Sequence, residues 1–322
     1  MKIFLATTAL ALIASTSFAD TITLYTSQPN ADAQKTVDAF MAANPGTEVE
    51  WVRDGTTKLM ARLRAEIEAG SPQPDILLIA DTVTLEGMAQ DGLLTAYQSP
   101  EATNYDSALY SSEGYYHSTK LITTGIVYNT GVEGAPKSWG DLTDAAIKGQ
   151  IAMPSPLYSG AALIHLATLT GDDSLGWSYY EQLAANDARA QGGNGGTFKA
   201  VASGEKPYGM VVDFLAIRNK ADGSPIEFVF PTEGVSYVTE PVAIMSSAKN
   251  LEGAQQFVDF LLSEAGQDLV LEMGYIPARD GMGVPEGFPA RNEIKLMDFD
   301  PADALENADA NKAKFAELFG AE

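Results

Sequence analysis

The segment from Gly149 to Gly171, GQIAMPSPLYSGAALIHLATLTG, constrains the fold of this chain more than any other. Ile151 to Met153 is a short apolar strand, a Pro-Ser-Pro loop follows, and Ser159-Gly160-Ala161 opens an apolar helix that stops at Gly171. A strand that leads into such a helix predicts an open α/β sheet with the helix start at its carboxyl edge, where ligands bind. Unpaired N–H groups at a helix start favour an anion. The alternative is that Ser159 only caps the helix.

Strands and helices alternate along both halves of the chain. The first half has three apolar strands, each followed by a turn that opens a helix: strands at 21–25, 48–52 and 76–80, and turns at 26–30, 54–57 and 81–84. The run 76–80 is continuously apolar, which is typical of a parallel strand buried on both faces. A second series follows at 151–170, 191–203 and 208–214. Because strand-to-helix loops of parallel strands share one edge, these loops should converge.

Two strand-like segments, at 125–129 and 236–240, are predicted to pass between two lobes and form a hinge. The first lobe would contain residues 20–124 and 240–277, and the second residues 128–236 and 278–322. The terminal helix, at about 301–319, is expected to close on the second lobe.

The first 19 residues have the pattern of a secretory signal, with basic Lys2, an apolar stretch from Ile3 to Ala14 and a cleavage site at Ser17-Phe18-Ala19. The mature chain would carry 19 basic against 43 acidic residues, a formal charge of −24, which disfavours nucleic acid and anionic lipid as partners. There is no cysteine, hence no disulfide, thiolate metal site or lipid-modified cysteine. We expect a periplasmic protein without a lipid anchor, and a monomer.

No catalytic motif is evident in the sequence. The two histidines are His117 and His165, and His165 lies within the apolar helix, where a core histidine is the better interpretation than a catalytic base. Nucleophile-elbow, H-E-x-x-H, EF-hand and Walker patterns are absent. We therefore expect no enzymatic activity, no metal and no cofactor. A secreted hydrolase or phosphatase is the competing class.

Hydroxyl groups and glycines gather at four predicted helix starts, two in each lobe, and would surround a compact anion from both sides. Asp81 and Asp213 follow strand ends at the same edge, where each is either a helix cap or a counter-ion for a cationic group on the ligand. The Gly-rich segment 191–197 is either part of the site or a flexible turn. The candidate ligand-binding residues are Tyr25, Thr26, Ser27, Thr56, Thr57, Asp81, Tyr158, Ser159, Gly160, Ala161, Asn194, Thr197, Asp213, Phe214 and Tyr237.

Short motifs in a specific order resemble the extracellular solute-binding proteins of ABC importers, in the group that includes binders of ferric iron, thiamine and sugar phosphates or phosphonates. The motifs are FMAANP at 40–45, LRAE at 63–66, Pro74-Asp75, Gly92-Leu93-Leu94, GIVYN at 125–129, Pro136-Lys137-Ser138-Trp139, Ser159-Gly160, Ser203-Gly204-Glu205 and KNLEGAQQFVDFL at 249–261. The resemblance implies a type II periplasmic-binding-protein fold, in which each lobe is a mostly parallel sheet flanked by helices and two strands form the hinge. The two lobes close on one small ligand and deliver it to a membrane permease with its ATPase.

Within that group, the iron-binding branch has adjacent tyrosines after the strand that ends here at Val212, whereas this chain has Asp213-Phe214. The pairs Tyr115-Tyr116 and Tyr179-Tyr180 lie elsewhere. The Ser-Gly helix start resembles that of phosphate-recognising members, and an Asp would suit an ammonium group. The leading ligand is therefore 2-aminoethylphosphonate, held by N–H groups and hydroxyls more than by arginine, with ferric iron, thiamine and sugar phosphates as alternatives. Arg53, and less so Arg218, are the arginines nearest the predicted site.

Overall fold

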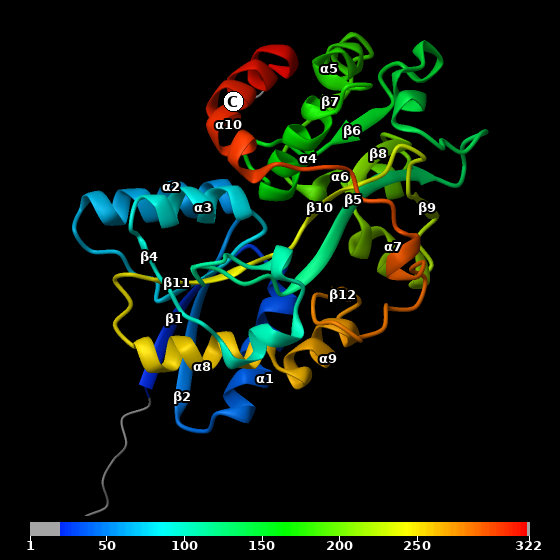
Figure 1. Cartoon of the computed structure of the whole chain (residues 1–322). Coiled ribbons are helices and arrows are strands. Elements are labelled where there is room, and N and C mark those ends of the chain that lie inside the picture. The colour runs from blue at the N-terminus through cyan, green and yellow to red at the C-terminus, as the bar shows by residue number, and fades with distance from the viewer. Residues whose placement is uncertain (1–19, 321–322) are drawn as a thin grey trace, which may run out of the picture.

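The computed structural model describes residues 20–320, so the predicted signal sequence at 1–19 lies outside the described residues. The chain forms two α/β lobes, each built on its own sheet and flanked by helices (Figure 1). This arrangement confirms the predicted fold class.

The first sheet has the strand order β2-β1-β3-β11-β4. Its strands are β1 (Asp20–Thr26), β2 (Thr47–Arg53), β3 (Ile76–Leu78), β4 (Leu94–Thr95) and β11 (Val242–Met245). β1 is parallel to β2 and β3, while β11 is antiparallel to β3 and β4. The helices α1 (Asn30–Ala43), α2 (Thr56–Glu68) and α3 (Thr82–Gln90) each follow one of the parallel strands, so all three begin at the same edge. The apolar strand β3 is buried throughout, as predicted.

The second sheet has the order β10-β5-β8-β6-β7, with β9 and β12 also paired to β5. Its strands are β5 (Lys120–Asn129), β6 (Ile151–Met153), β7 (Arg189–Ala190), β8 (Tyr208–Val212), β9 (Ile226–Val229), β10 (Ser236–Val238) and β12 (Ile276–Pro277). β6 is parallel to β7 and β8, whereas β5 runs antiparallel to all its neighbours. The sheet is therefore mixed and not mostly parallel as predicted, because the long strand β5 runs antiparallel to four strands.

The second lobe carries α4 (Gly160–Gly171), α5 (Gly176–Ala185), α6 (Asn194–Ala202) and α7 (Asp213–Ala221). Helices α8 (Leu251–Leu262) and α9 (Glu264–Glu272) pack on each other, and α8 packs on the first sheet. Short 3₁₀ helices lie in the connections, at Pro100–Asn104, Ser107–Leu109, Trp139–Thr143, Ala145–Ile147 and Arg291–Glu293.

The chain passes between the lobes at about 117–121 and 238–241, side by side. The N–H groups of Thr119 and Lys120 both donate to the carbonyl of Thr239, at 3.1 and 3.2 Å. The predicted crossing at 125–129 is displaced, because these residues pair with β8 and β9 inside the second sheet. The return crossing falls within a residue or two of the expected 236–240. The first crossing leads directly into β5, which is a continuous strand over Lys120–Asn129, so local pattern does not reveal where along it the chain joins the second sheet.

Helix α10 (Pro301–Phe319) packs against α4 and α5, as expected, and also against α3 of the first lobe (Figure 1). Its ring of Phe315 lies 6.0 Å from that of Tyr180 in the second lobe. At its other end, a Cβ placed on Gly87 of α3 would lie 3.2 Å from Cδ1 of Leu305. The terminal helix therefore bridges both lobes and does not belong to the second alone.

The histidine in α4 is part of the core, as predicted. Nδ1 of His165 lies 2.8 Å from Oγ of Ser236, and its ring packs 4.8 Å from that of Trp139. Burial lowers the pKa of His165 to about 3, so the ring is neutral at physiological pH. The pair Tyr179-Tyr180 is also buried, within α5.

Candidate functional site

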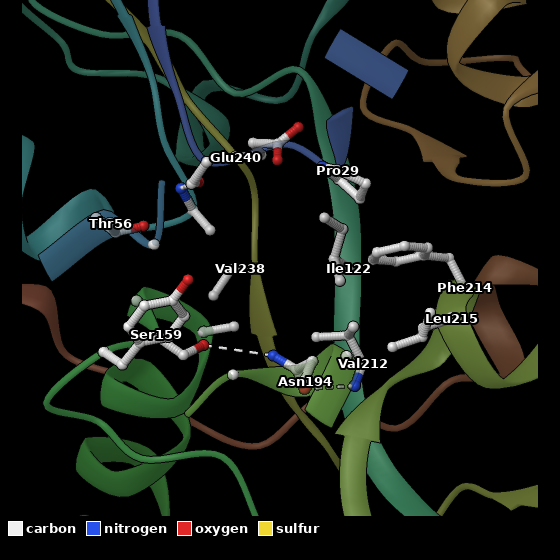
Figure 2. A pocket seen from close by; sticks show the side chains of 18 of the residues that line it. Pro29, Thr56, Ile122, Ser159, Asn194, Val212, Phe214, Leu215, Val238 and Glu240 are labelled. Carbon is white, nitrogen blue, oxygen red and sulfur yellow. Dashed lines mark hydrogen bonds between the residues drawn. The ribbon is translucent and has the colours of Figure 1, made fainter. Parts of the chain in front are cut away.

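A cavity of about 340 Å³ lies between the lobes, at the small end of the range of about 300–1,000 Å³ for small-molecule sites. Figure 2 shows its lining, with polar groups of both lobes around an apolar middle formed by side chains such as Ile122 and Val238. Eight of the fifteen candidate residues line it: Ser27, Thr56, Tyr158, Ser159, Gly160, Ala161, Asn194 and Phe214.

The start of α4 forms one wall of the cavity. Ser159 is the N-cap, and its Oγ accepts from the N–H of Ala162 and from Nδ2 of Asn194, both at 3.3 Å. The hydroxyl proton of Ser159 remains available to a ligand. The N–H groups of Gly160 and Ala161 form no hydrogen bond within the described part of the chain. The helix start thus combines a cap with open donors.

The start of α6 lies beside that of α4. Its N-cap, Gly193, provides no side-chain cap, and the N–H groups of Asn194 and Gly195 have no partner among residues 20–320. The side chain of Asn194 is held in place, because its Oδ1 accepts from the N–H of Val212 at 3.1 Å while its amide reaches Ser159. The Gly-rich segment is therefore an ordered helix start at the cavity.

The first lobe contributes the opposite wall. Oγ of Ser27 accepts from the N–H of Ala80 at 3.0 Å. The helix α2 begins after Gly55 without a side-chain cap. Thr56 lines the cavity, and its Oγ1 is buried with no hydrogen-bond partner among the described residues. A buried hydroxyl without a partner is costly, so this atom is suited to a ligand. Arg53 also lines the cavity, and its Nε donates to the carbonyl of Gln28 at 2.7 Å.

The two walls touch, so the structure is a closed form. The phenol of Tyr158 donates to Oδ1 of Asp54 across the cleft at 3.2 Å. A Cβ on Gly55 would lie 2.7 Å from the carbonyl oxygen of Tyr158, and one on Gly160 would lie 2.8 Å from Oγ1 of Thr56. These two glycines allow the lobes to approach as closely as they do.

Glu240 is the charged cavity residue that sequence reasoning missed. Its side chain is buried and its Oε2 accepts from Lys120 in an ion pair and from Nε2 of Gln28 at 3.3 Å. Its Oε1 has no partner among the described residues. Glu240 also has a positive φ of 39°, a strained conformation for a non-glycine residue. The only sequence signal was an acidic residue followed by proline within the apolar return crossing.

The two aspartates predicted as either helix caps or counter-ions do not line the cavity. Oδ1 of Asp81 caps α3 by accepting from the N–H of Thr84 at 3.1 Å, and burial raises its pKa. Asp213 is buried beneath β5, where Oδ2 accepts from the N–H and Oγ1 of Thr123 at 2.8 and 2.7 Å. Burial raises the pKa of Asp213 to about 6. Both carboxylates are held by the protein itself, as the capping alternative implies for Asp81.

Five further candidates also lie outside the lining: Tyr25, Thr26, Thr57, Thr197 and Tyr237. The phenol of Tyr25 donates to Oε1 of Glu66 at 2.7 Å, and Oγ1 of Thr26 accepts from the N–H of Gln28 at 3.1 Å. Thr57 lines a neighbouring groove instead. Thr197 is buried one turn into α6, and Tyr237 packs in an apolar cluster with Leu121. Successive strand residues face opposite sides, so adjacency to a site residue does not place a side chain in the site.

The electrostatics of the cavity favour an anion at the polar end. The starts of α2, α4 and α6 all lie at the cavity, each with N–H groups that lack protein partners within residues 20–320. A helix start carries a partial positive charge, so three of them together attract a compact anion. Figure 2 shows Glu240 at the far end from Ser159 and Asn194. The cavity therefore has a donor-rich end and an end with one free carboxylate oxygen.

The described residues contain no cluster of three His, Cys, Asp or Glu side chains that could hold a metal ion. No helix within residues 20–320 is both long and apolar enough to span a membrane.

Comparisons with known proteins agree with this architecture. Residues 71–304 match the family of bacterial extracellular solute-binding proteins. The iron uptake protein A1 of Synechocystis is 26% identical over 85% of this chain and 80% of its own. A probable ABC transporter periplasmic-binding protein of Sinorhizobium fredii is 26% identical over 81% of this chain and 75% of its own.

Two solved structures share the fold. The periplasmic binding protein AfuA of Actinobacillus pleuropneumoniae, with fructose-6-phosphate bound, has a TM-score of 0.85 at 23% identity and covers 94% of this chain and 99% of its own. Iron-bound HitA of Pseudomonas aeruginosa has a TM-score of 0.79 at 23% identity, with 92% and 99% covered. With most of its length matched by the family, this chain belongs to the bacterial extracellular solute-binding proteins.

Proposed function

We propose that this protein is the solute-binding component of an ABC importer and that its ligand is a small organic solute with a phosphate or phosphonate group. The observation that carries the proposal is the meeting of three helix starts, with the hydroxyls of Ser159 and Thr56, around one cavity between two lobes. Groups of this kind bind phosphate without an arginine. Fructose-6-phosphate in the structural relative AfuA is consistent with this chemistry.

Two ligands share the anionic group and differ at the other end. For 2-aminoethylphosphonate, the ammonium needs a carboxylate, and we propose Oε1 of Glu240 in place of Asp81 or Asp213. For a sugar phosphate, the same oxygen would accept from a hydroxyl. Lys120 neutralises Glu240 in either case, so the far end of the cavity carries little net charge.

Ferric iron is the weaker alternative, although relatives are described as iron-uptake or iron-bound proteins. Hard ferric iron needs phenolate or carboxylate oxygens. The lining offers one phenol, Tyr158, which is bonded to Asp54, and one carboxylate, Glu240, which is paired with Lys120. We also propose that the chain has no enzymatic activity, since His165 is neutral within the core.

In this role the protein would act in the periplasm as a monomer and deliver its solute to a membrane permease with its ATPase. The name of the Sinorhizobium relative supports the transporter assignment. The acidic surface supports the expectation that nucleic acid is not a partner.

A ligand screen tests the proposal. Thermal shifts with 2-aminoethylphosphonate, ethylphosphonate, a sugar phosphate, thiamine phosphate and ferric citrate should show stabilisation by at least one phosphate or phosphonate. Preference for the amine over ethylphosphonate would support the Glu240 contact, and preference for the sugar phosphate would support the second candidate. Stabilisation by ferric citrate alone would refute the anion site.

Calorimetry with the best compound then tests the site itself. Ser159→Ala should weaken binding by about 1–3 kcal/mol, because a hydrogen bond to a charged oxygen is lost. Ser263→Ala is the matched control, since Ser263 caps α9 by accepting from the N–H of Gly266 at 3.2 Å, away from the cavity. Both variants lose a cap, but only Ser159→Ala should lose affinity. Equal affinities would leave Ser159 as a cap only.

A further inference from the structure

Arg218 of the second lobe reaches Asp32 of the first, in a socket at the boundary between the lobes. We define the Arg218 socket as Asp32, Gly274 and Tyr275. Nη1 and Nη2 of Arg218 donate to Oδ1 and Oδ2 of Asp32 at 3.2 and 3.1 Å, a two-pronged contact, and Nη2 lies 3.4 Å from the phenol oxygen of Tyr275. Asp32 lies in the first turn of α1, and Tyr275 follows α9, whereas Arg218 lies on α7.

The socket is shaped for this side chain. Asp32 has 5% of its side chain exposed and also accepts from the phenol of Tyr275. Gly274 has a φ of +80°, and a Cβ there would lie 3.0 Å from Cδ of Arg218. The aliphatic part of the arginine thus fills the space that a side chain at 274 would occupy. Two-pronged pairs with a buried carboxylate are stronger than ordinary surface ion pairs.

The socket is linked to the cavity through α7, which carries Arg218, and through α1, which carries Asp32. The guanidinium of Arg218 lies 4.6 Å from the ring centroid of Phe214, one turn earlier on α7, and Phe214 lines the cavity (Figure 2). On the other side, the N–H of Asp32 donates to the carbonyl of Pro29, which also lines the cavity. The ion pair therefore joins the lobes one helical turn outside the ligand space.

We propose that Arg218 is a positioning residue that latches the closed form: it enters the socket when the lobes close, holds Phe214 against the ligand space and does not touch the ligand. Opening separates Arg218 on α7 from Asp32 on α1. The latch therefore shifts the balance between the open and closed forms and can be released reversibly.

Paired spin labels test the latch. The chain has no cysteine, so Glu68→Cys on α2 and Gln182→Cys on α5, both exposed, place one label on each lobe. Distances are measured without ligand and with saturating inorganic phosphate, 2-aminoethylphosphonate or glucose 6-phosphate. The latch variants are Arg218→Met, which keeps much of the apolar stem, and Asp32→Asn. The matched control, Arg279→Met, breaks a 2.7 Å pair with Glu101 that lies outside the cavity lining.

The wild type should show a short, closed distance in at least one condition. In that condition, each latch variant should lower the closed-to-open ratio roughly tenfold. The double variant should lower the ratio no further than Arg218→Met alone, because Asp32→Asn acts on closure through its pair with the arginine. The control should match the wild type. The inference is overturned if the latch variants keep wild-type distances, whether or not their melting temperature falls. It is also overturned if the effects of Arg218→Met and Asp32→Asn add in the double variant, or if the wild type stays open in every condition.

Discussion

Replacing Gly160 by alanine should oppose closure of the lobes while leaving the second lobe intact. A Cβ there would lie 2.8 Å from Oγ1 of Thr56 and 3.0 Å from Cβ of Asp81, and both neighbours belong to the first lobe. Forcing an extra methyl group into such a contact costs about 1–3 kcal/mol. Because about 1.4 kcal/mol is a factor of ten, affinity for a solute held between the lobes should fall by about 5-fold to about 140-fold.

The same change should have the opposite effect on the ligand-free protein. Gly160 lies in the first turn of α4 without a positive φ, and alanine at such a position stabilises by about 0.4–1 kcal/mol through the unfolded chain. Melting curves without ligand should therefore be unchanged or shifted upwards, while calorimetry shows weaker binding. Gly171→Ala is the control, because it lies at the other end of α4 with no atom near a new Cβ. Wild-type affinity in Gly160→Ala would refute the closed geometry.

Three further substitutions have distinct signatures. Thr56→Val should weaken ligand binding about tenfold by calorimetry. Because it removes a buried hydroxyl that has no protein partner, the stability of the ligand-free protein should stay equal or rise, and a lower stability would contradict this. Tyr158→Phe should speed ligand release about twofold to tenfold in stopped-flow traces with association unchanged, because its bond to Asp54 forms on closure. Burial raises the pKa of Asp213 to about 6, so the folded protein binds the carboxyl proton of Asp213 more tightly than the unfolded chain does. The protonated carboxyl therefore stabilises the fold at low pH, and this contribution is lost as the pH rises from about 4 to 6. Urea unfolding should show the wild type losing about 2–3 kcal/mol relative to Asp213→Asn over that range, and parallel pH profiles would contradict it.

The order of strands and helices, and the helix starts at the cavity, follow from local sequence. The strand at 76–80 and the helix start at 159–160 are determined by residues close in sequence, so the local pattern is sufficient to predict them. His165 is predictable as a core residue for the same reason, because its helix is apolar on most of its surface.

The charged part of the site could not be predicted in this way. Asp213 and Glu240 are both acidic residues beside a strand end, and tertiary contacts decide which faces the cavity. Asp213 is captured by Thr123, ninety residues away in sequence. The direction of Glu240 depends on its positive φ and on Lys120 in the other crossing. The displaced crossing has the same cause, since strand pairing within β5 is not encoded in its pattern.

Amide chemical shifts of ¹⁵N-labelled protein test the central claim most directly. When the phosphate or phosphonate selected by the thermal screen is titrated in, the amide protons of Gly160, Ala161, Asn194 and Gly195 should move downfield by the largest amounts, because they gain a hydrogen bond to a charged oxygen. Ser159→Ala should reduce these shifts at equal ligand concentration. Saturation with the ligand that leaves these amides unmoved, with the large shifts elsewhere, would contradict an anion site at the meeting of the helix starts.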